Sequence, residues 1–278
     1  MSAADHLSVE TMAKCISGEV EPEEVYGIVL PHLLARCATC RQTHAELHRL
    51  LRTSHHCDLW TMWLELQDVP GLSAQLGDLP FAEQLRLVEA DEAFHTWMFC
   101  RSLAQQSLEA AAHRQPQAVP LAALALAVSH RLGSDYDDEW VHDLRVECRA
   151  YLAHALHATG DLAGARREFA QARADNARGG TGIFRITAEI DRLEALLHRE
   201  QGNLPKALAL YNRALAVFGG DDPEDRDPAL ARQVRAGGNA CRRLLDRGHQ
   251  GLQLRRSRRP DRSARSSASG KAQRKRLP

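Results

Sequence analysis

The sequence predicts an all-α protein, and three observations support this prediction. Of the 278 residues 44% are hydrophobic but only 5% are aromatic, a composition that suits closely packed helices better than a β-sandwich. Apolar residues recur at helical spacing along most of the chain. Two segments also align with each other at an offset of 42 residues, and each has the pattern of a helix hairpin.

The net charge is formally zero, but it is unevenly distributed along the chain. Residues 251–278 hold ten Lys or Arg against one Asp, so this segment carries about +9 and residues 1–250 about −9. Such asymmetry is typical of a basic tail. No apolar run is long enough to span a membrane, and the first residues lack the pattern of a signal peptide. A cytoplasmic location without a membrane partner is therefore expected.

The N-terminal part predicts three short helices. Residues 8–17 form the first, which ends at Gly18. A second helix begins at Pro22, because proline is tolerated in a first turn, and Pro31 predicts a kink within it. The residues after Cys40 continue as a polar helix to about residue 51. We therefore assign residues 1–53 to a small helical domain.

The middle of the chain predicts a connection followed by helices. Residues 54–81 mix tryptophans with Pro and Gly, and we interpret them as a connecting segment. Helical periodicity then predicts one helix over residues 82–112 and another over residues 118–132. These two would form one helix hairpin, and residues 94–132 would be a degenerate copy of the repeat described next.

The clearest organisation lies between residues 140 and 218. At the offset of 42 residues Gly160 matches Gly202, and each glycine follows a long amphipathic helix. Asp161 or Asn203 comes next, so each copy has a helix-ending glycine followed by an N-cap residue. This pattern predicts two tight helix-turn-helix units. Further matches join Leu162 to Leu204, Ala165 to Ala207, Phe169 to Tyr211 and Ala172 to Ala214.

The run Ala155-Leu156-(x3)-Gly160-Asp161-Leu162-(x2)-Ala165-(x3)-Phe169-(x2)-Ala172 resembles the second half of a tetratricopeptide repeat. The copy over residues 202–214 resembles another. The family period is 34 residues, and the Gly-rich stretch over residues 176–182 holds much of the excess here. The resemblance implies an α-solenoid over residues 82–218, with a concave groove for a peptide or helix of a protein partner.

The pattern weakens after Phe218, and we expect residues 219–278 to be mostly disordered. Residues 229–234 offer one short helical run, which Gly237 and Gly238 interrupt. From His249 on, apolar side chains are too sparse to offset the entropy of ordering the segment. A helical array normally ends in a capping helix. Its apparent absence raises the hypothesis that the tail is an out-of-frame end of a longer array.

A candidate metal site lies in the first 53 residues. His6, His32, Cys37 and Cys40 offer two imidazoles and two thiols, the four ligands of a structural Zn²⁺ site. Cys15 competes with His6 for one position. The chain has seven cysteines, an odd number that argues against a disulfide framework. The alternatives are that the cysteines are ordinary buried thiols or that the CxxC pair is redox-active, although no βαβ context surrounds it.

The same region resembles the zinc-binding domain of bacterial anti-sigma factors, whose pattern is an upstream His or Cys followed by HxxxCxxC. By this resemblance His6, His32, Cys37 and Cys40 are ligands of a structural zinc ion, and a sigma factor is the type of partner implied. Here four residues separate His32 from Cys37, so one regular helix cannot present all three downstream ligands. Either a bulge absorbs the extra residue, or the helix ends between Ala35 and Arg36.

The sequence thus predicts a regulatory or adaptor protein that binds a protein partner. This protein would contain a structural zinc ion and would have no enzymatic activity. No nucleophile with a neighbouring base, phosphate loop or dinucleotide fingerprint is present in the sequence. The alternative is a nucleic-acid-associated zinc protein that uses its basic tail. The tail has no interleaved aromatic residues for base stacking, so this second hypothesis is weaker.

Overall fold

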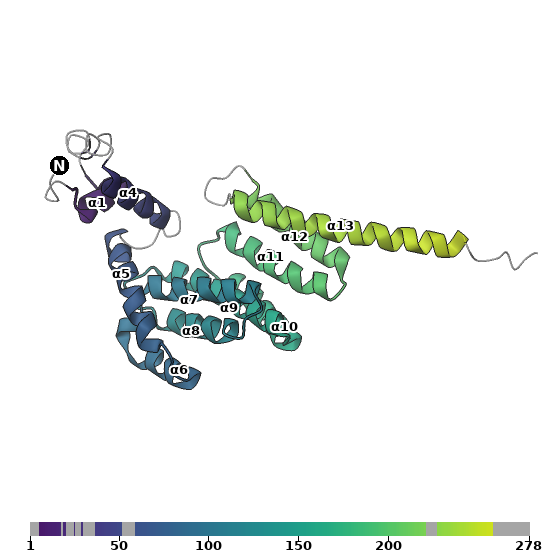
Figure 1. Ribbon diagram of the computed structural model, residues 1–278, viewed down its shortest axis with the longest axis horizontal. Coiled ribbons are helices and arrows are strands. Elements are labelled where there is room, and N and C mark those ends of the chain that lie inside the picture. Colours follow the sequence, from purple (N-terminus) through teal and green to yellow (C-terminus); the bar gives the residue numbers. More distant parts are fainter. Residues whose placement is uncertain are drawn as a thin grey trace, which may run out of the picture.

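The computed structural model describes residues 6–17, 19–20, 25, 29, 37–51, 59–220 and 227–257. Within these ranges every regular element is a helix, which confirms the all-α prediction. Figure 1 shows helices stacked side by side from α5 to α12, with α13 lying along α12 and extending past its end. None of the helices in the described ranges is long and apolar enough to cross a membrane.

Three helix hairpins form the centre of the molecule. The two helices of each hairpin pack against each other, and the first helices of successive hairpins also meet, α7 with α9 and α9 with α11. This is the arrangement of a helical-repeat stack. The hairpins are α7 (Trp97–Ala112) with α8 (Ala118–Arg131), α9 (Asp138–Thr159) with α10 (Leu162–Asn176), and α11 (Phe184–Glu200) with α12 (Leu204–Phe218).

The two turns predicted from the repeat alignment are confirmed. Gly160 and Gly202 have φ angles of 98° and 75°, a left-handed conformation that favours glycine. The Asp161 carboxylate then accepts a hydrogen bond from the backbone N–H of Gly164 at 2.8 Å and caps α10. Ala165 and Ala207 on the second helices are fully buried, because a small side chain lets the paired helix approach closely.

The prediction of one continuous helix over residues 82–112 is wrong. The structure has α6 (Phe81–Ala90), a short 3₁₀ turn at Glu92–Phe94 and then α7. Asp91 caps the short turn through the N–H of Ala93, and Thr96 caps α7 through the N–H of Phe99. Phe94 between them is fully buried. The helix breaks because this aromatic ring is drawn into the core and two polar caps satisfy the freed backbone groups.

The segment interpreted as a connection, residues 54–81, contains a helix, α5 (Leu59–Leu76). Pro70 lies inside this helix on its exposed face. Proline cannot donate the backbone hydrogen bond of a helix, and packing of the opposite face compensates for this loss. Four side chains bury that face: Met62, Val69, Leu72 and Leu76. Helix α5 packs on α7 and α6 packs on α8, so this pair continues the alternation of the stack.

A buried carboxylate attaches α5 to the first hairpin. Glu65 on α5 accepts hydrogen bonds from the Tyr136 hydroxyl at 2.6 Å and from the backbone N–H of Met98 at 2.9 Å. The Tyr136 oxygen in turn accepts one from the backbone N–H of Trp97 at 3.1 Å. Burial raises the pKa of Glu65, and these donors oppose the rise. The network satisfies N–H groups at the beginning of α7 that would otherwise be unpaired.

The expected disorder after residue 218 is wrong for residues 228–257, which form the long helix α13 (Pro228–Ser257). Gly237 and Gly238 lie inside this helix, where α13 contacts α12. A Cβ atom on Gly237 would lie only 2.6 Å from Cζ of Tyr211. The glycine therefore permits close helix packing, and α13 caps the last hairpin. The observation behind the frameshift hypothesis is removed, and residues 258–278 lie outside the described part.

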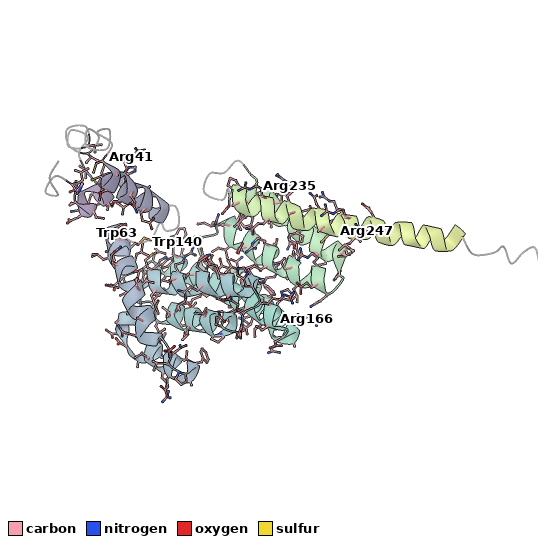
Figure 2. The ribbon with its side chains drawn as sticks, viewed as in Figure 1. Arg41, Trp63, Trp140, Arg166, Arg235 and Arg247 are labelled. Carbon is pink, nitrogen blue, oxygen red and sulfur yellow. The ribbon has the colours of Figure 1, made fainter. Side chains whose placement is uncertain are left out.

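The N-terminal region contains α1 (Val9–Ser17) and α4 (Ala38–Leu51), which match the first and third predicted helices. The second predicted helix, with its kink at Pro31, falls mainly outside the described residues. Buried side chains of both helices, including Met12 and Leu47, belong to the same hydrophobic core as α5 and α7. Trp63 packs against this core at the end of α5 nearest α4 (Figure 2).

Candidate metal centre and groove

The candidate metal centre forms where the beginnings of α1 and α4 meet. The Ser8 hydroxyl caps α1 by accepting a hydrogen bond from the N–H of Thr11 at 2.9 Å, and His6 precedes this cap. Cys37 directly precedes α4, and Cys40 lies in its first turn. Because α1 packs against α4, the imidazole reaches both sulfur atoms.

The three ligand atoms have a spacing that suits a metal ion. Nδ1 of His6 lies 3.2 Å from Sγ of Cys37 and 3.8 Å from Sγ of Cys40. All three ligand atoms lie within 4.8 Å of one another. In a tetrahedral zinc site, bonds of about 2.0 and 2.3 Å put nitrogen and sulfur ligands about 3.6 Å apart. His6, Cys37 and Cys40 can therefore hold a metal ion.

The two thiols have different electrostatic environments. Hydrogen bonding by the backbone N–H of Cys40 lowers the pKa of Cys37, and the N–H of Thr39 acts in the same direction. Burial raises the pKa of Cys40, which is less than 2% exposed. Cys37 is thus the thiol that ionises more readily. The positive end of α4 points toward it.

The structure brings together three of the four predicted ligands. His32 lies outside the described residues, as do residues 30–36, where the bulge or helix break was expected. Cys37 before α4 and Cys40 in its first turn fit the alternative in which a new helix begins at this point. Cys15 is not a member of the cluster found among the described residues.

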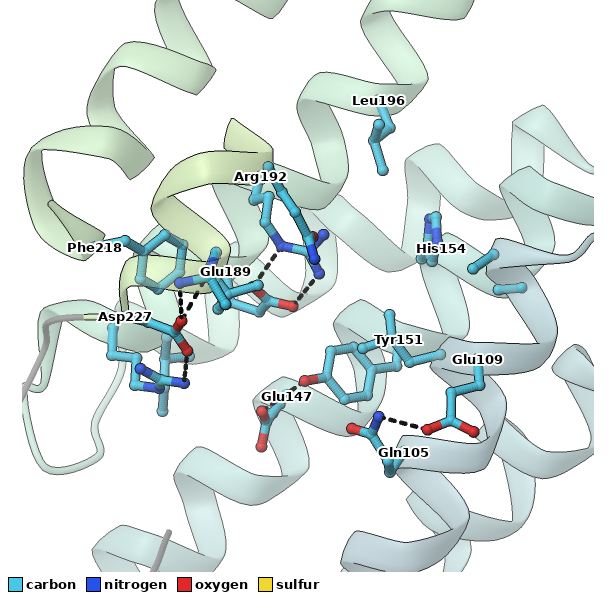
Figure 3. Close-up of a pocket in the computed structure, with 18 of the residues that line it drawn as sticks. Gln105, Glu109, Glu147, Tyr151, His154, Glu189, Arg192, Leu196, Phe218 and Asp227 are labelled. Atoms are coloured by element: carbon cyan, nitrogen blue, oxygen red, sulfur yellow. Dashed lines mark hydrogen bonds and ion pairs between the residues drawn. The ribbon is translucent and has the colours of Figure 1, made fainter. Parts of the chain in front are cut away.

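A groove of about 1070 Å³ runs along the first helices of the three hairpins and ends at α13. The side chains on its walls come from α7, α9, α11 and α13, with Tyr211 and Phe218 added from α12. Apolar residues from several helices line it: Trp97, Leu108, Trp140, Leu144, Ile186 and Leu196. Figure 3 shows lining residues of α7, α9 and α11 together with Phe218 and Asp227.

Ion pairs neutralise most charges in the groove. Arg101 on α7 pairs with Glu147 on α9, which raises the pKa of the guanidinium. The Tyr151 hydroxyl donates to the same carboxylate at 2.8 Å. On α11 the buried Arg192 makes two hydrogen bonds with Glu189, and this pairing keeps it charged despite burial. The groove is therefore polar along its floor but nearly self-neutral.

Two histidines of α9 also line the groove. Burial lowers the pKa of His154 to about 3, so its imidazole is neutral at physiological pH. Burial also lowers the pKa of His157, whose Nε2 lies 3.1 Å from a Glu200 carboxylate oxygen that partly opposes the shift. Arg114 pairs with the other oxygen of Glu200 at 2.9 Å.

A groove is predictable from the repeat pattern of the sequence, but the residues that line it are not. One signal was present, since the offset of 42 residues also aligns Glu147 with Glu189, and both carboxylates pair with groove arginines. The same offset aligns His157 with Arg199. These matches fall on the face of the first helices that lines the groove, whereas the matches used for prediction were packing positions.

Comparison of the chain with protein-family models, with curated proteins and with solved structures gives no match. The geometry of the metal centre and of the groove therefore carries the functional argument.

Proposed function

We propose that this chain is an adaptor or regulatory protein, not an enzyme, that binds a peptide or helix of a protein partner in its groove. The observation that supports this proposal is the groove itself, which runs across three hairpins and has apolar walls with a few buried polar groups. Extended grooves of this kind are how stacked helical repeats bind peptides. The resemblance of residues 155–172 and 202–214 to tetratricopeptide repeats supports the same function.

The metal of the N-terminal site is zinc in this proposal. Two thiolates and an imidazole are soft or borderline ligands, which favour Zn²⁺ over Mg²⁺ or Ca²⁺. His32 would complete four protein ligands, so the role would be structural. A region of this size buries little core of its own, and metal binding there would be coupled to folding.

The resemblance of this region to anti-sigma factors supports a role in transcription regulation, with a sigma factor as the type of partner. In that case the metal-stabilised region and the groove would contact protein at two places on one chain. Linked contacts of this kind raise the effective affinity for a shared partner.

A second candidate function is nucleic-acid binding, favoured by the exposed face of α13. Figure 2 shows Arg235 and Arg247 on this helix. On α13 the exposed arginines without a carboxylate partner among the described residues are Arg232, Arg235, Arg242, Arg243 and Arg247. A salt titration of DNA binding distinguishes the two functions, because phosphate contacts predict an affinity that rises steeply as salt falls.

Capture of partners from the native host tests the main proposal. Gln105 lines the groove and is exposed, whereas its neighbour Gln106 is exposed but does not line it. Gln105→Trp should block the groove and lose the partners that wild type captures, while Gln106→Trp should keep them. A Cys37→Ser/Cys40→Ser variant tests the contribution of the metal centre separately. Equal partner sets for wild type and Gln105→Trp would contradict binding in the groove.

A further inference from the structure

Polar groups without partners gather at the end of the groove between α9, α11 and α13. The Tyr211 hydroxyl from α12 is buried, with 2% of the residue exposed, and no group among the described residues hydrogen-bonds to it. Nδ1 of His154 is also buried and lacks a partner in the described part of the chain. Both residues line the groove. Nδ1 of His157, which also lines the groove, is a third such atom among the described residues. Buried polar groups are nearly always hydrogen-bonded, so these atoms in one cavity indicate that something else binds there.

A cation that pairs with no carboxylate in the described part of the chain also lines the groove. Arg199 lines the groove one helical turn beyond Leu196, is half-buried, and pairs with no carboxylate among the described residues. Burial raises the pKa of Tyr211, and the charges of Arg199 and Arg192 partly offset this rise. Arg199 and Tyr211 both line the groove. Burial also raises the pKa of the Cys241 thiol, and the charge of Arg199 partly offsets that rise.

Among the described residues that line the groove, Arg199 is the arginine without a carboxylate partner. Arg192 is neutralised by Glu189, and Arg114 is neutralised by Glu200. His154 is neutral because burial holds its pKa near 3. Figure 3 shows Arg192 and His154 on the two walls of this part of the groove. A guanidinium and a hydroxyl donor that line one groove are a donor set that suits a carboxylate.

We infer that this end of the groove binds the side-chain carboxylate of one Asp or Glu in a peptide segment of the partner. The inference rests on the proposed function and specifies the chemistry of its ligand. The positive charge of Arg199, which no carboxylate neutralises in the described part of the chain, matches one negative charge on the ligand. The apolar walls toward Trp97 and Trp140 match apolar residues on the same segment, so a peptide fits this groove better than a free anion.

Selection of peptides tests this inference. Random dodecapeptides displayed on phage would be selected on the full-length protein, and clones that Gln105→Trp fails to bind would be kept. The selected peptides would be synthesised with blocked ends and their affinities measured by fluorescence anisotropy. We expect one Asp or Glu at a constant position between apolar residues. Its exchange for Asn or Gln should weaken binding at least tenfold.

The arginine is tested with the same peptides. The Arg199→Gln variant should bind the acidic peptide at least tenfold more weakly than wild type does. It should bind the neutral peptide as tightly as wild type does. Tyr211→Phe, which removes only the hydroxyl, should weaken the acidic peptide alone. The control Arg166→Gln changes an exposed arginine of α10 outside the groove and should have no effect. Circular dichroism would show that each variant is folded.

Several results would overturn the inference. Groove-dependent peptides without an acidic residue would contradict it and leave the proposed function standing. So would equal affinity of wild type and Arg199→Gln for the acidic peptides. A neutral peptide that binds again when its C-terminal block is removed would show that the site binds a C-terminal carboxylate and not a side-chain carboxylate. If selection gives no groove-dependent peptide, the proposed function fails together with the inference.

Discussion

Two adjacent glycines of α13 allow a sharp test of how this helix packs. A Cβ atom on Gly237 would lie 2.6 Å from Cζ and 2.9 Å from Oη of Tyr211. A Cβ atom on Gly238 would have its nearest neighbours at 3.7 and 3.8 Å, which is ordinary contact. Glycine inside a helix costs roughly 0.5–1 kcal/mol relative to alanine. Gly238→Ala should therefore stabilise the protein by about that amount.

Gly237→Ala should have the opposite effect. Carbon atoms in favourable contact are about 3.5–4.0 Å apart, so the buried Tyr211 ring would have to move by about 1 Å. Overpacking of this kind costs about 1–3 kcal/mol, and the gain in helix propensity offsets only part of it. We expect a net loss of about 1 kcal/mol and a difference of about 2 kcal/mol between the two variants.

Urea unfolding followed by circular dichroism at 222 nm measures both changes. The two substitutions are chemically identical and adjacent, so each serves as the control of the other. If both stabilise the protein equally, α13 does not pack on Tyr211 as described, and its role as the capping helix is wrong.

Three further predictions concern the metal centre and two buried groups. Native mass spectrometry should find one zinc ion per chain, lost in the Cys37→Ser/Cys40→Ser variant, and a wild-type protein that retains no metal would contradict the site. The pKa of His154 is lowered to about 3 in the folded protein, whereas in the unfolded chain it is near 6.5. Protonation of His154 therefore favours the unfolded state, and the protein loses stability as the pH falls below about 6.5. Between pH 7 and 5 this loss amounts to about 2 kcal/mol, and His154→Leu should remove it whereas the exposed His113→Leu should not. Glu65→Leu should destabilise the protein by about 2–4 kcal/mol by leaving two donors unpaired, and Glu65→Gln should cost less, as thermal unfolding would show.

The parts of the fold that local sequence chemistry controls were predictable. A glycine at a left-handed position followed by an N-cap residue is a local signal, so the turns at Gly160 and Gly202 could be located. The candidate metal site was predictable in the same sense, because His6, Cys37 and Cys40 are rare ligands at a recognisable spacing. His32 remains a prediction.

The misassigned parts depend on tertiary contacts. Pro70 interrupts the helical pattern of α5, and only packing on α7 explains why the helix continues. Gly237 and Gly238 signal a break in isolation, yet the ring of Tyr211 requires a residue without a side chain at that point. The break near Phe94 also arises from burial of a ring in a core assembled from distant segments.

The groove residues were missed for a related reason. Arg199 and His154 are ordinary polar residues of amphipathic helices in the sequence. Their importance follows from the stacking of α9 beside α11, which brings them to one cavity, where the Arg199 guanidinium and Nδ1 of His154 have no partner among the described residues. Sequence spacing shows which residues share a helix face, but not which face meets another.

Site-specific photo-crosslinking in the native host tests the central claim of a partner-binding groove most directly. A benzophenone amino acid in place of Gln105 would lie in the groove, and one in place of the exposed Arg166 would lie on α10 outside it (Figure 2). The account predicts a crosslinked protein partner from position 105 and none from position 166. Crosslinks from position 166 alone, or equal crosslinks from both, would contradict it.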